Sequence, residues 1–195
     1  MKRYFSYLPT LILLVATAAM LWHGPIPQLE RYHEFADHST WVGVPHAADV
    51  LSNLGFAFVA VWGGSRLWAQ RNCADVRRAW MGYQLFLGAL LLTACGSTFY
   101  HLAPDNWRLI WDRLPIALAC AGLLVAARAE LIAGVNLQRE AAMLTLFAVA
   151  SVAWWYVTEQ RGHGDLRLYL LLQGLPLILI PQYQGTAGDA RRAAS

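Results

Sequence analysis

The hydrophobic residues of this chain fall into six apolar runs separated by short polar stretches. The runs cover residues 7–22, 50–69, 79–100, 114–135, 141–157 and 166–183. Each approaches the roughly 20 residues that an α-helix needs to cross the hydrocarbon core of a bilayer. None shows the alternation of apolar and polar residues that a membrane β-barrel strand requires. The pattern therefore predicts an all-α fold, a polytopic transmembrane helical bundle of about six helices.

The first run allows two interpretations. Lys2 and Arg3, the apolar run and the tripeptide ATA at 16–18 together resemble a signal peptide with its cleavage site. Further apolar runs of spanning length follow, however, and these favour a first helix that is retained. We expect the retained helix, with the cleaved signal as the open alternative.

The last run contains Pro176 and Pro181, which predict kinks because proline is tolerated in membrane helices. The sequence contains no internal repeat and no composition shift that would separate two domains. We therefore expect a single transmembrane bundle domain over residues 1–183. The remaining residues, 184–195, are small and polar, which predicts a short disordered tail.

Composition supports a membrane protein and narrows its partners. The chain has 195 residues, of which 57% are hydrophobic and 14% charged, whereas a soluble chain has roughly 25% charged residues. The formal charge of +3 is small and scattered, which argues against a nucleic-acid partner. The three cysteines show no CxxC spacing, so neither a disulfide framework nor a thiolate metal site is expected.

The loops predict an orientation. If six helices alternate, one side of the membrane receives most of the cations, namely Lys2, Arg3, Arg66, Arg71, Arg77, Arg78, Arg128, Arg139, Arg191 and Arg192. By the positive-inside rule this side is cytoplasmic, and it holds both termini. The opposite side receives all six histidines, namely His23, His33, His38, His46, His101 and His163. In a bacterium, the chain would lie in the inner membrane with its histidine-rich and acidic face in the periplasm.

Three polar residues near the junction of the third and fourth runs are candidates for chemistry. Ser97 and His101 share one face of a helix, and Asp112 stands at the mouth of the next helix. Ionisable groups at membrane depth are costly and often functional. Imidazole binds zinc, a carboxylate can act as a general base, and a hydroxyl can stabilise an oxyanion. A structural interpretation is also open, in which Asp112 pairs with Arg108 or Arg113.

Two further polar stretches lie on the same side. The first, at 32–54, contains His33, Glu34, Asp37, His38, His46 and Asp49. It predicts either a second metal site or the rim of a substrate entrance; the alternative is a solvated loop followed by a helix that Asp49 caps. In the second stretch His163 stands between Gly162 and Gly164 and Asp165 follows them, which favours a turn and a capped helix start over a role in chemistry.

Three segments together resemble the alkaline ceramidase family of integral membrane hydrolases, which shares a superfamily with the adiponectin-receptor-like proteins. The segments are DVLSNLGF from Asp49, GSTFYHLAPDNWRLIWDRLP from Gly96 and GDLRLY from Gly164. The resemblance is greatest to bacterial ceramidase-like members and covers roughly residues 32–181. It implies a seven-helix bundle that binds zinc and hydrolyses the amide of ceramide. The first apolar run would be an addition before the family's own first helix.

The resemblance assigns roles to the three candidates. His101 matches the first zinc histidine of the family's S-x3-H pattern. Ser97 matches the serine of that pattern, which stabilises the oxyanion. Asp112 matches the aspartate that orients or deprotonates the zinc-bound water. The implied substrate is a membrane lipid that reaches the site from the outer leaflet.

Two features of the family are not matched. The family completes its zinc site with an H-x3-H pair on its final helix, whereas the only later histidine here is His163. A catalytic zinc normally takes three protein ligands, so further ligands would have to come from His33, His46 or His163. The family's calcium-binding acidic cluster is also poorly matched, because His46 stands where an acid is expected, although Glu34 and Asp37 lie close by.

Three interpretations follow from these mismatches. In the first, the chain is a truncated or frame-shifted member without the family's last two helices and their H-x3-H pair. In the second, it completes its zinc site with other histidines, and in the third it has lost hydrolysis and keeps a role in binding lipid. The abrupt change from LPLILIP to QYQGTAGDARRAAS favours the first. The functional prediction is a ceramidase-like, zinc-dependent amidohydrolase, inactive if its second and third zinc histidines are missing. The alternative is a non-catalytic lipid-binding or receptor-like membrane protein of the same fold.

Overall fold

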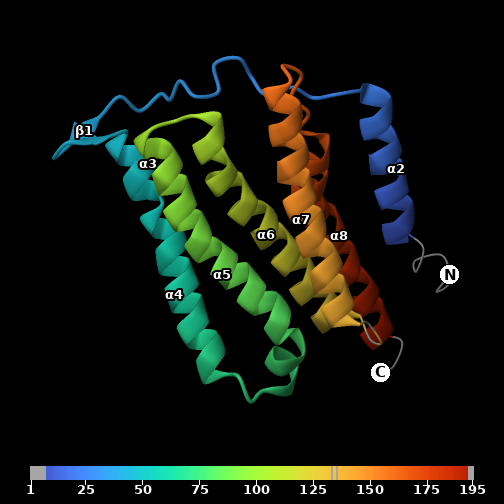
Figure 1. Ribbon diagram of the computed structural model, residues 1–195. Helices are drawn as coiled ribbons and strands as arrows, with labels where there is room; N and C mark the ends of the chain where they lie inside the picture. Colours follow the sequence, from blue (N-terminus) through green and yellow to red (C-terminus); the bar gives the residue numbers. More distant parts are fainter. Residues whose placement is uncertain (1–7, 133, 135, 193–195) are drawn as a thin grey trace.

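Helices make up almost all of the regular structure (Figure 1). The computed structural model describes residues 8–132, 134 and 136–192. Its helices are α2 (Leu8–His23), α3 (Ala47–Ser52), α4 (Leu54–Ala69), α5 (Ala74–Leu102), α6 (Asn106–Leu131), α7 (Leu137–Gln160) and α8 (Arg167–Arg192). Two short strands, β1 (Thr40–Trp41) and β2 (Val44–Pro45), pair as an antiparallel hairpin. The prediction of an all-α bundle is confirmed.

Among the residues that the structure describes, four helical segments are long and apolar enough to cross a membrane: Ala47–Ala69, Val76–Leu102, Asn106–Leu131 and Leu137–Gln160. The first of them joins α3 and α4, because Asn53 between them keeps helical backbone angles. Helix α2 is apolar but has only 16 residues, and α8 contains two prolines and ends in polar residues. The six predicted runs thus correspond to α2, α3 with α4, and α5 to α8. The chain is a multi-pass membrane protein.

Helix α6 begins well before the apolar run at 114–135 that predicted it. Asp105 caps the helix, because its Oδ1 accepts a hydrogen bond of 2.7 Å from the backbone N–H of Arg108. A capped first turn of this kind satisfies a backbone donor that would otherwise be unpaired. Asp112 therefore lies inside the second turn of α6. The expectation that it stands at the mouth of the helix is wrong.

Helix α8 also extends further than predicted. It continues through residues 184–192 to Arg192, where the sequence predicted a disordered tail. Adding residues to an existing helix costs little compared with starting one, and this stretch contains alanine and arginine, which favour helices. Pro176 and Pro181 lie within α8. Residues 193–195 of the predicted tail, and Lys2 and Arg3 of the possible signal peptide, lie outside the described residues.

Helices α5 and α6 pack with their backbones in contact at glycines. A Cβ atom on Gly96 would lie 1.8 Å from the carbonyl oxygen of Trp111, and one on Gly122 would lie 2.4 Å from the backbone nitrogen of Phe86. Gly82 is as tightly packed against α6. Small residues allow two membrane helices to approach in this way. This contact sets the distance between the side chains next to Gly96 and those next to Trp111.

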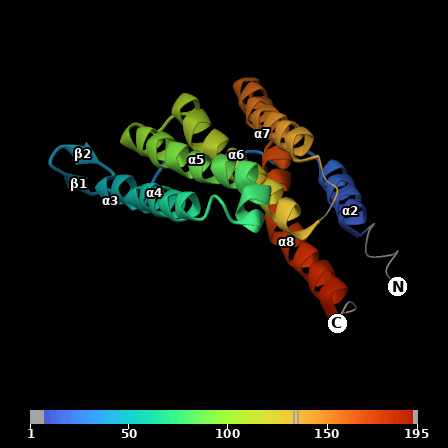
Figure 2. The same ribbon diagram turned by 90° about the horizontal axis from the view of Figure 1, so that it is seen from below.

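Helix α6 is the most buried of the four spanning segments. It lies between α5 on one side and α7 and α8 on the other (Figure 2). The core around it contains Leu109 and Leu124 of α6, Trp155 of α7 and Leu172 of α8, each at most 1% exposed. The apolar residues that stay exposed, such as those along α4, form the surface that faces lipid.

The connections between the helices alternate between two ends of the bundle (Figure 1). One end holds the long segment 24–46, the α5–α6 turn and the α7–α8 turn, and all six histidines lie there. We call it the histidine-rich end. The other end holds the α4–α5 and α6–α7 turns, and we call it the arginine-rich end. This arrangement is the one that the alternation of six helices predicts.

Candidate functional site

Ser97 and Asp112 face each other across the α5–α6 interface. Each follows directly after the residue at which the two backbones touch, Gly96 on α5 and Trp111 on α6. Ser97 is 6% exposed and Asp112 is half-buried. The Asp112 carboxylate accepts a side-chain hydrogen bond from Ser97 and interacts electrostatically with His101. The close glycine contact therefore brings together the three residues that the sequence selected.

His101 lies in the last turn of α5, next to a second carboxylate. Its Nδ1 atom is 3.7 Å from Oδ2 of Asp49 on α3, and no described residue forms a hydrogen bond with that buried nitrogen. The ring of Phe35, from the segment 24–46, covers His101 with the ring centroids 4.5 Å apart. The sequence did not pair Asp49 with His101, because only the fold brings α3 beside the end of α5. We call Ser97, His101, Asp112 and Asp49 the polar cluster.

Asp37, and not Asp49, provides the cap of α3. Its carboxylate accepts hydrogen bonds from the backbone N–H groups of Ser39 at 2.8 Å, Ala48 at 2.8 Å and Asp49 at 3.2 Å. The hydroxyl and backbone N–H of Ser39, with the N–H groups of Asp49 and Ala48, lower the pKa of Asp37 to about 2. The expectation that Asp49 caps this helix is wrong.

The acids near the expected calcium site are engaged by other groups. The Asp37 oxygens accept hydrogen bonds from backbone N–H groups, and Glu34 forms an exposed ion pair with Arg31 at 3.0 Å. Both acids therefore have partners within the chain that explain their positions without a bound metal. Calcium therefore stays an expectation that comes from the resemblance alone.

His33 holds the segment 24–46 to the α5–α6 turn. Its Nδ1 lies 2.9 Å from the hydroxyl of Tyr100, and its Nε2 lies 2.9 Å from the side-chain oxygen of Asn106. Gln28 donates to the same Asn106 oxygen at 3.1 Å. Both ring nitrogens of His33 thus have hydrogen-bond partners at the end of α5 and the start of α6, so binding a metal would require one of these contacts to break.

The other two histidines considered as zinc ligands, His46 and His163, each have a backbone carbonyl as hydrogen-bond partner. His46 Nδ1 lies 2.6 Å from the carbonyl oxygen of Asp37. His163 Nδ1 lies 2.9 Å from the carbonyl oxygen of Arg161 in the exposed α7–α8 turn. Within residues 8–132, 134 and 136–192, no group of three or more His, Cys, Asp or Glu side chains is placed to hold a metal ion. The described residues therefore do not fit the three-ligand zinc site that the resemblance implies.

Arg113 is a buried cation that the sequence analysis named only as a possible partner of Asp112. It is 3% exposed, and its guanidinium carbon lies 4.0 Å from the ring centroid of Trp155, 4.9 Å from that of Tyr32 and 5.5 Å from that of Tyr169. Aromatic faces attract a cation in this geometry. The interaction between Arg113 and Asp112 is electrostatic, so the structure places a fixed positive charge next to the polar cluster. The only sequence signal was an arginine beside an aspartate directly before the apolar run at 114–135.

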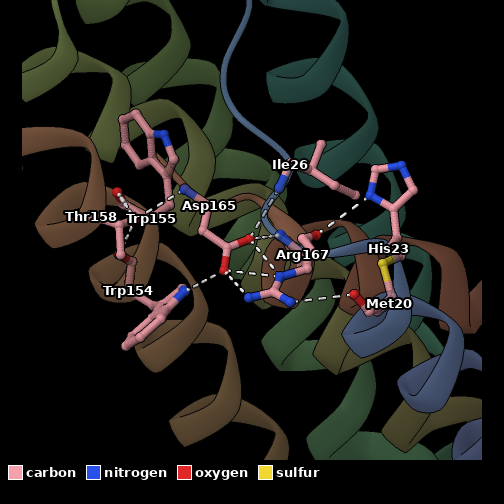
Figure 3. A network of polar contacts seen from close by, with 9 residues as sticks. Met20, His23, Ile26, Trp154, Trp155, Thr158, Asp165 and Arg167 are labelled. Atoms are coloured by element: carbon pink, nitrogen blue, oxygen red, sulfur yellow. Dashed lines mark hydrogen bonds and ion pairs between the residues drawn. The ribbon is translucent and has the colours of Figure 1, made fainter. Parts of the chain in front are cut away.

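A second polar network ties the segment 24–46 to the far side of the bundle (Figure 3). The buried carboxylate of Asp165 accepts hydrogen bonds from Arg167 Nη2 at 2.7 Å, from Trp154 Nε1 at 3.0 Å and from the backbone of Ile26 at 3.4 Å. The backbone N–H of Asp165 donates to the Thr158 hydroxyl at 3.0 Å. Burial alone would raise the pKa of Asp165, but the hydrogen bonds from Arg167 and Trp154 hold it well below its ordinary value.

Asp165 also accepts a hydrogen bond of 3.1 Å from the backbone N–H of Arg167, as its predicted position at the start of α8 implies. Arg167 reaches in turn to the carbonyl oxygen of Met20 at the end of α2, at 3.4 Å (Figure 3). This network is structural, since it joins α2, α7 and α8 through groups that have partners. The polar cluster is thus the candidate site, with a hydroxyl, an imidazole and two carboxylates in one place.

Comparison with known proteins finds no family model, no curated protein and no solved structure that matches this chain.

Proposed function

We propose that this chain is a ceramidase-like membrane hydrolase that cleaves the amide bond of ceramide or of a related lipid. One observation carries the proposal: Asp112 interacts with both Ser97 and His101. These are the same three residues to which the resemblance assigns roles. Their convergence at the α5–α6 interface, at the end of a membrane bundle, suits a substrate whose amide lies near the membrane surface.

The chemistry available to the cluster is the hydrolysis of an amide. Asp112 takes a proton from a water molecule as the water oxygen adds to the carbonyl carbon of the substrate. The Ser97 hydroxyl donates a hydrogen bond to the carbonyl oxygen as negative charge develops there. The C–N bond then breaks, and the nitrogen takes the proton that Asp112 held. The products are a free amine and a carboxylic acid.

Zinc belongs to the proposal through the resemblance, with His101 as the residue that would bind it. When bound, zinc would supply a Lewis acid that polarises the carbonyl group or the water. The described residues offer His101 with Asp49 at 3.7 Å and do not complete a three-ligand set. The metal content of the purified protein is for this reason part of the test.

The substrate would enter from the leaflet at the histidine-rich end, where the polar cluster lies. The turns of the arginine-rich end and the helix ends that adjoin them hold Arg66, Arg71, Arg77, Arg78, Arg128 and Arg139. By the positive-inside rule we assign that end to the cytoplasm. In a bacterial inner membrane, the polar cluster would then face the periplasm.

A second function, from a different class, is supported by the loop contacts. His33 bonds to Tyr100 and Asn106, and His46 bonds to the backbone of Asp37. Histidines engaged in holding a loop in place leave fewer side chains for metal binding, which is compatible with a non-catalytic protein that keeps the fold and binds lipid. In such a protein the polar cluster would bind the polar group of a lipid without cleaving it.

The test measures the release of fatty acid from ceramide in mixed detergent micelles, with and without added zinc, and measures the zinc content of each sample. We expect Asp112→Asn to reduce the rate by about 100-fold or more, the range in which a general base contributes. Glu34→Gln is the matched control, because Glu34 is an exposed acid outside the cluster. It should keep the rate of the unmodified protein.

The measurements of zinc content, fatty-acid release and lipid binding test metal binding, the role of Asp112 and hydrolysis separately. Stoichiometric zinc that is lost in His101→Ala would support metal binding at His101. Release of fatty acid that Asp112→Asn leaves unchanged would contradict the role of Asp112. No release from ceramide above a heat-treated sample, combined with saturable binding of a fluorescent ceramide, would favour the lipid-binding protein instead.

A further inference from the structure

The hairpin formed by β1 and β2 has an apolar tip on an uncharged stretch of chain. Between Asp37 and Asp49 the sequence contains no Lys, Arg, Asp or Glu. Trp41 pairs with Val44, and the two residues between them, Val42 and Gly43, form the turn. Val42 is fully exposed and Trp41 is 64% exposed. The tip therefore presents the apolar side chains of Trp41 and Val42 to the surroundings of the protein.

The identity of Val42 does not follow from the geometry of the turn. Both turn residues have positive φ angles, 50° at Val42 and 81° at Gly43, which is the pattern of a type I′ hairpin. Asn, Asp and Gly are the residues that such a turn favours at its first position, and a β-branched residue there is strained. Since Val42 contributes no burial within the chain, its apolar side chain needs a reason outside the fold.

The position of the hairpin supplies that reason. It projects sideways from the histidine-rich end of α3 and α4, away from the other helices (Figures 1 and 2). The neighbouring face of this spanning segment is also apolar and exposed, with Leu51 at 44%, Leu54 at 63% and Phe58 at 67%. Tryptophan is enriched where a membrane protein meets the headgroup region. The tip continues the lipid-facing surface of the segment Ala47–Ala69 to the edge of the bilayer.

We propose that the β1–β2 hairpin is a membrane-interface anchor, whose partner is the lipid leaflet at the histidine-rich end. Trp41 and Val42 lie at the boundary between headgroups and acyl chains. The anchor also fixes the segment that covers the polar cluster, because Phe35 contacts both His46, at 5.0 Å between ring centroids, and His101. This inference does not depend on hydrolysis, and it holds equally for a lipid-binding protein.

The first experiment places a nitroxide spin label at Val42→Cys in the full chain, with the three native cysteines replaced by alanine. The protein is reconstituted in vesicles of phosphatidylethanolamine and phosphatidylglycerol. Relaxation of the label by oxygen, which is concentrated in lipid, is compared with relaxation by a water-soluble nickel complex. Glu34→Cys, an exposed position in the same segment, is the matched control. We expect oxygen to dominate at position 42 and the nickel complex to dominate at position 34.

A second measurement avoids the cysteine replacements. A benzophenone amino acid is placed at position 42 or 34 of the otherwise native chain, and the reconstituted protein is illuminated. A mass increase of one phospholipid at position 42, and none at position 34, is the expected result. Equal exposure of both positions to the nickel complex would overturn the proposal. Cross-linking of position 42 to a second copy of the chain would overturn it as well, and would identify the hairpin as a contact between copies.

Discussion

At the scale of single residues, the described part of the chain holds the buried charges of Asp165 and Arg113 in different ways. Asp165 is 3% exposed and pairs with Arg167, with Nη2 and Oδ2 2.7 Å apart. Arg113 is equally buried but lies among three aromatic rings. A buried ion that loses its partner keeps the full cost of leaving water. The stability of the histidine-rich end should therefore be sensitive to the Asp165–Arg167 pair.

Replacing the carboxylate of Asp165 tests this dependence. Asp165→Asn leaves Arg167 without a counter-charge and weakens the contacts with Trp154 and Ile26. We expect the free energy of unfolding to fall by about 3 kcal/mol, the size of effect seen when one partner of a buried pair is removed. Denaturation in mixed detergent micelles, followed by circular dichroism, measures the change. Glu34→Gln, which breaks the exposed pair with Arg31, should cost less than about 1 kcal/mol.

The pH dependence of the same variant gives an independent check. The pKa of Asp165 is lower in the folded protein than its ordinary value of 3.8, so its contribution to stability is complete above that value. It is lost as the pH falls below it, because the unfolded chain then binds the proton more tightly. The variant should lose this part of the acid sensitivity. Equal loss of stability toward low pH in both proteins would contradict the assignment.

At the scale of elements, the sequence predicted Ser97, His101 and Asp112 as site residues but not how the helices place them. Four-residue spacing puts Ser97 and His101 on one face of α5, and this follows from helix geometry alone. The position of Asp112 within α6 depended on the cap at Asp105, which a search for apolar runs does not detect. The approach of α5 to α6 depended on glycines, and a glycine in an apolar run gives no sign of its neighbour.

Gly96 is the point at which this packing can be tested. In Gly96→Ala the new methyl group would lie 1.8 Å from the Trp111 carbonyl oxygen, so α5 and α6 have to move apart. Overpacking of this kind typically costs about 1–3 kcal/mol, and it would separate Ser97 from Asp112. We expect reduced thermal stability in detergent, together with at least a tenfold loss of fatty-acid release from ceramide.

Gly88→Ala is the matched control for this prediction. Gly88 lies on the same helix, and no described atom comes within 4 Å of a Cβ placed on it. The alanine should leave both stability and activity close to those of the unmodified protein. If Gly96→Ala behaves in the same way as Gly88→Ala, the contact at Gly96 does not position the polar cluster.

At the scale of the whole molecule, the number and order of the helices could be predicted because apolar runs of membrane length are a strong signal. The path of the segment 24–46 could not. His33 meets Tyr100 and Asn106, and Ile26 meets Asp165; these partners are far apart in the sequence and belong to no periodic pattern. For the same reason the pairing of Asp49 with His101 appeared only in the fold.

The proposed orientation is testable through Cys73, which is exposed in the α4–α5 turn at the arginine-rich end. A maleimide reagent that does not cross membranes should label Cys73 in inside-out bacterial vesicles and leave it unlabelled in intact cells. Cys73→Ser should abolish the signal, because Cys95 and Cys120 lie within the spanning segments Val76–Leu102 and Asn106–Leu131, where a reagent that stays in water does not reach them. Glu34→Cys in the Cys73→Ser background should show the opposite pattern, with labelling in intact cells. Labelling of Cys73 from outside the cell would invert the topology and place the polar cluster at the cytoplasmic leaflet.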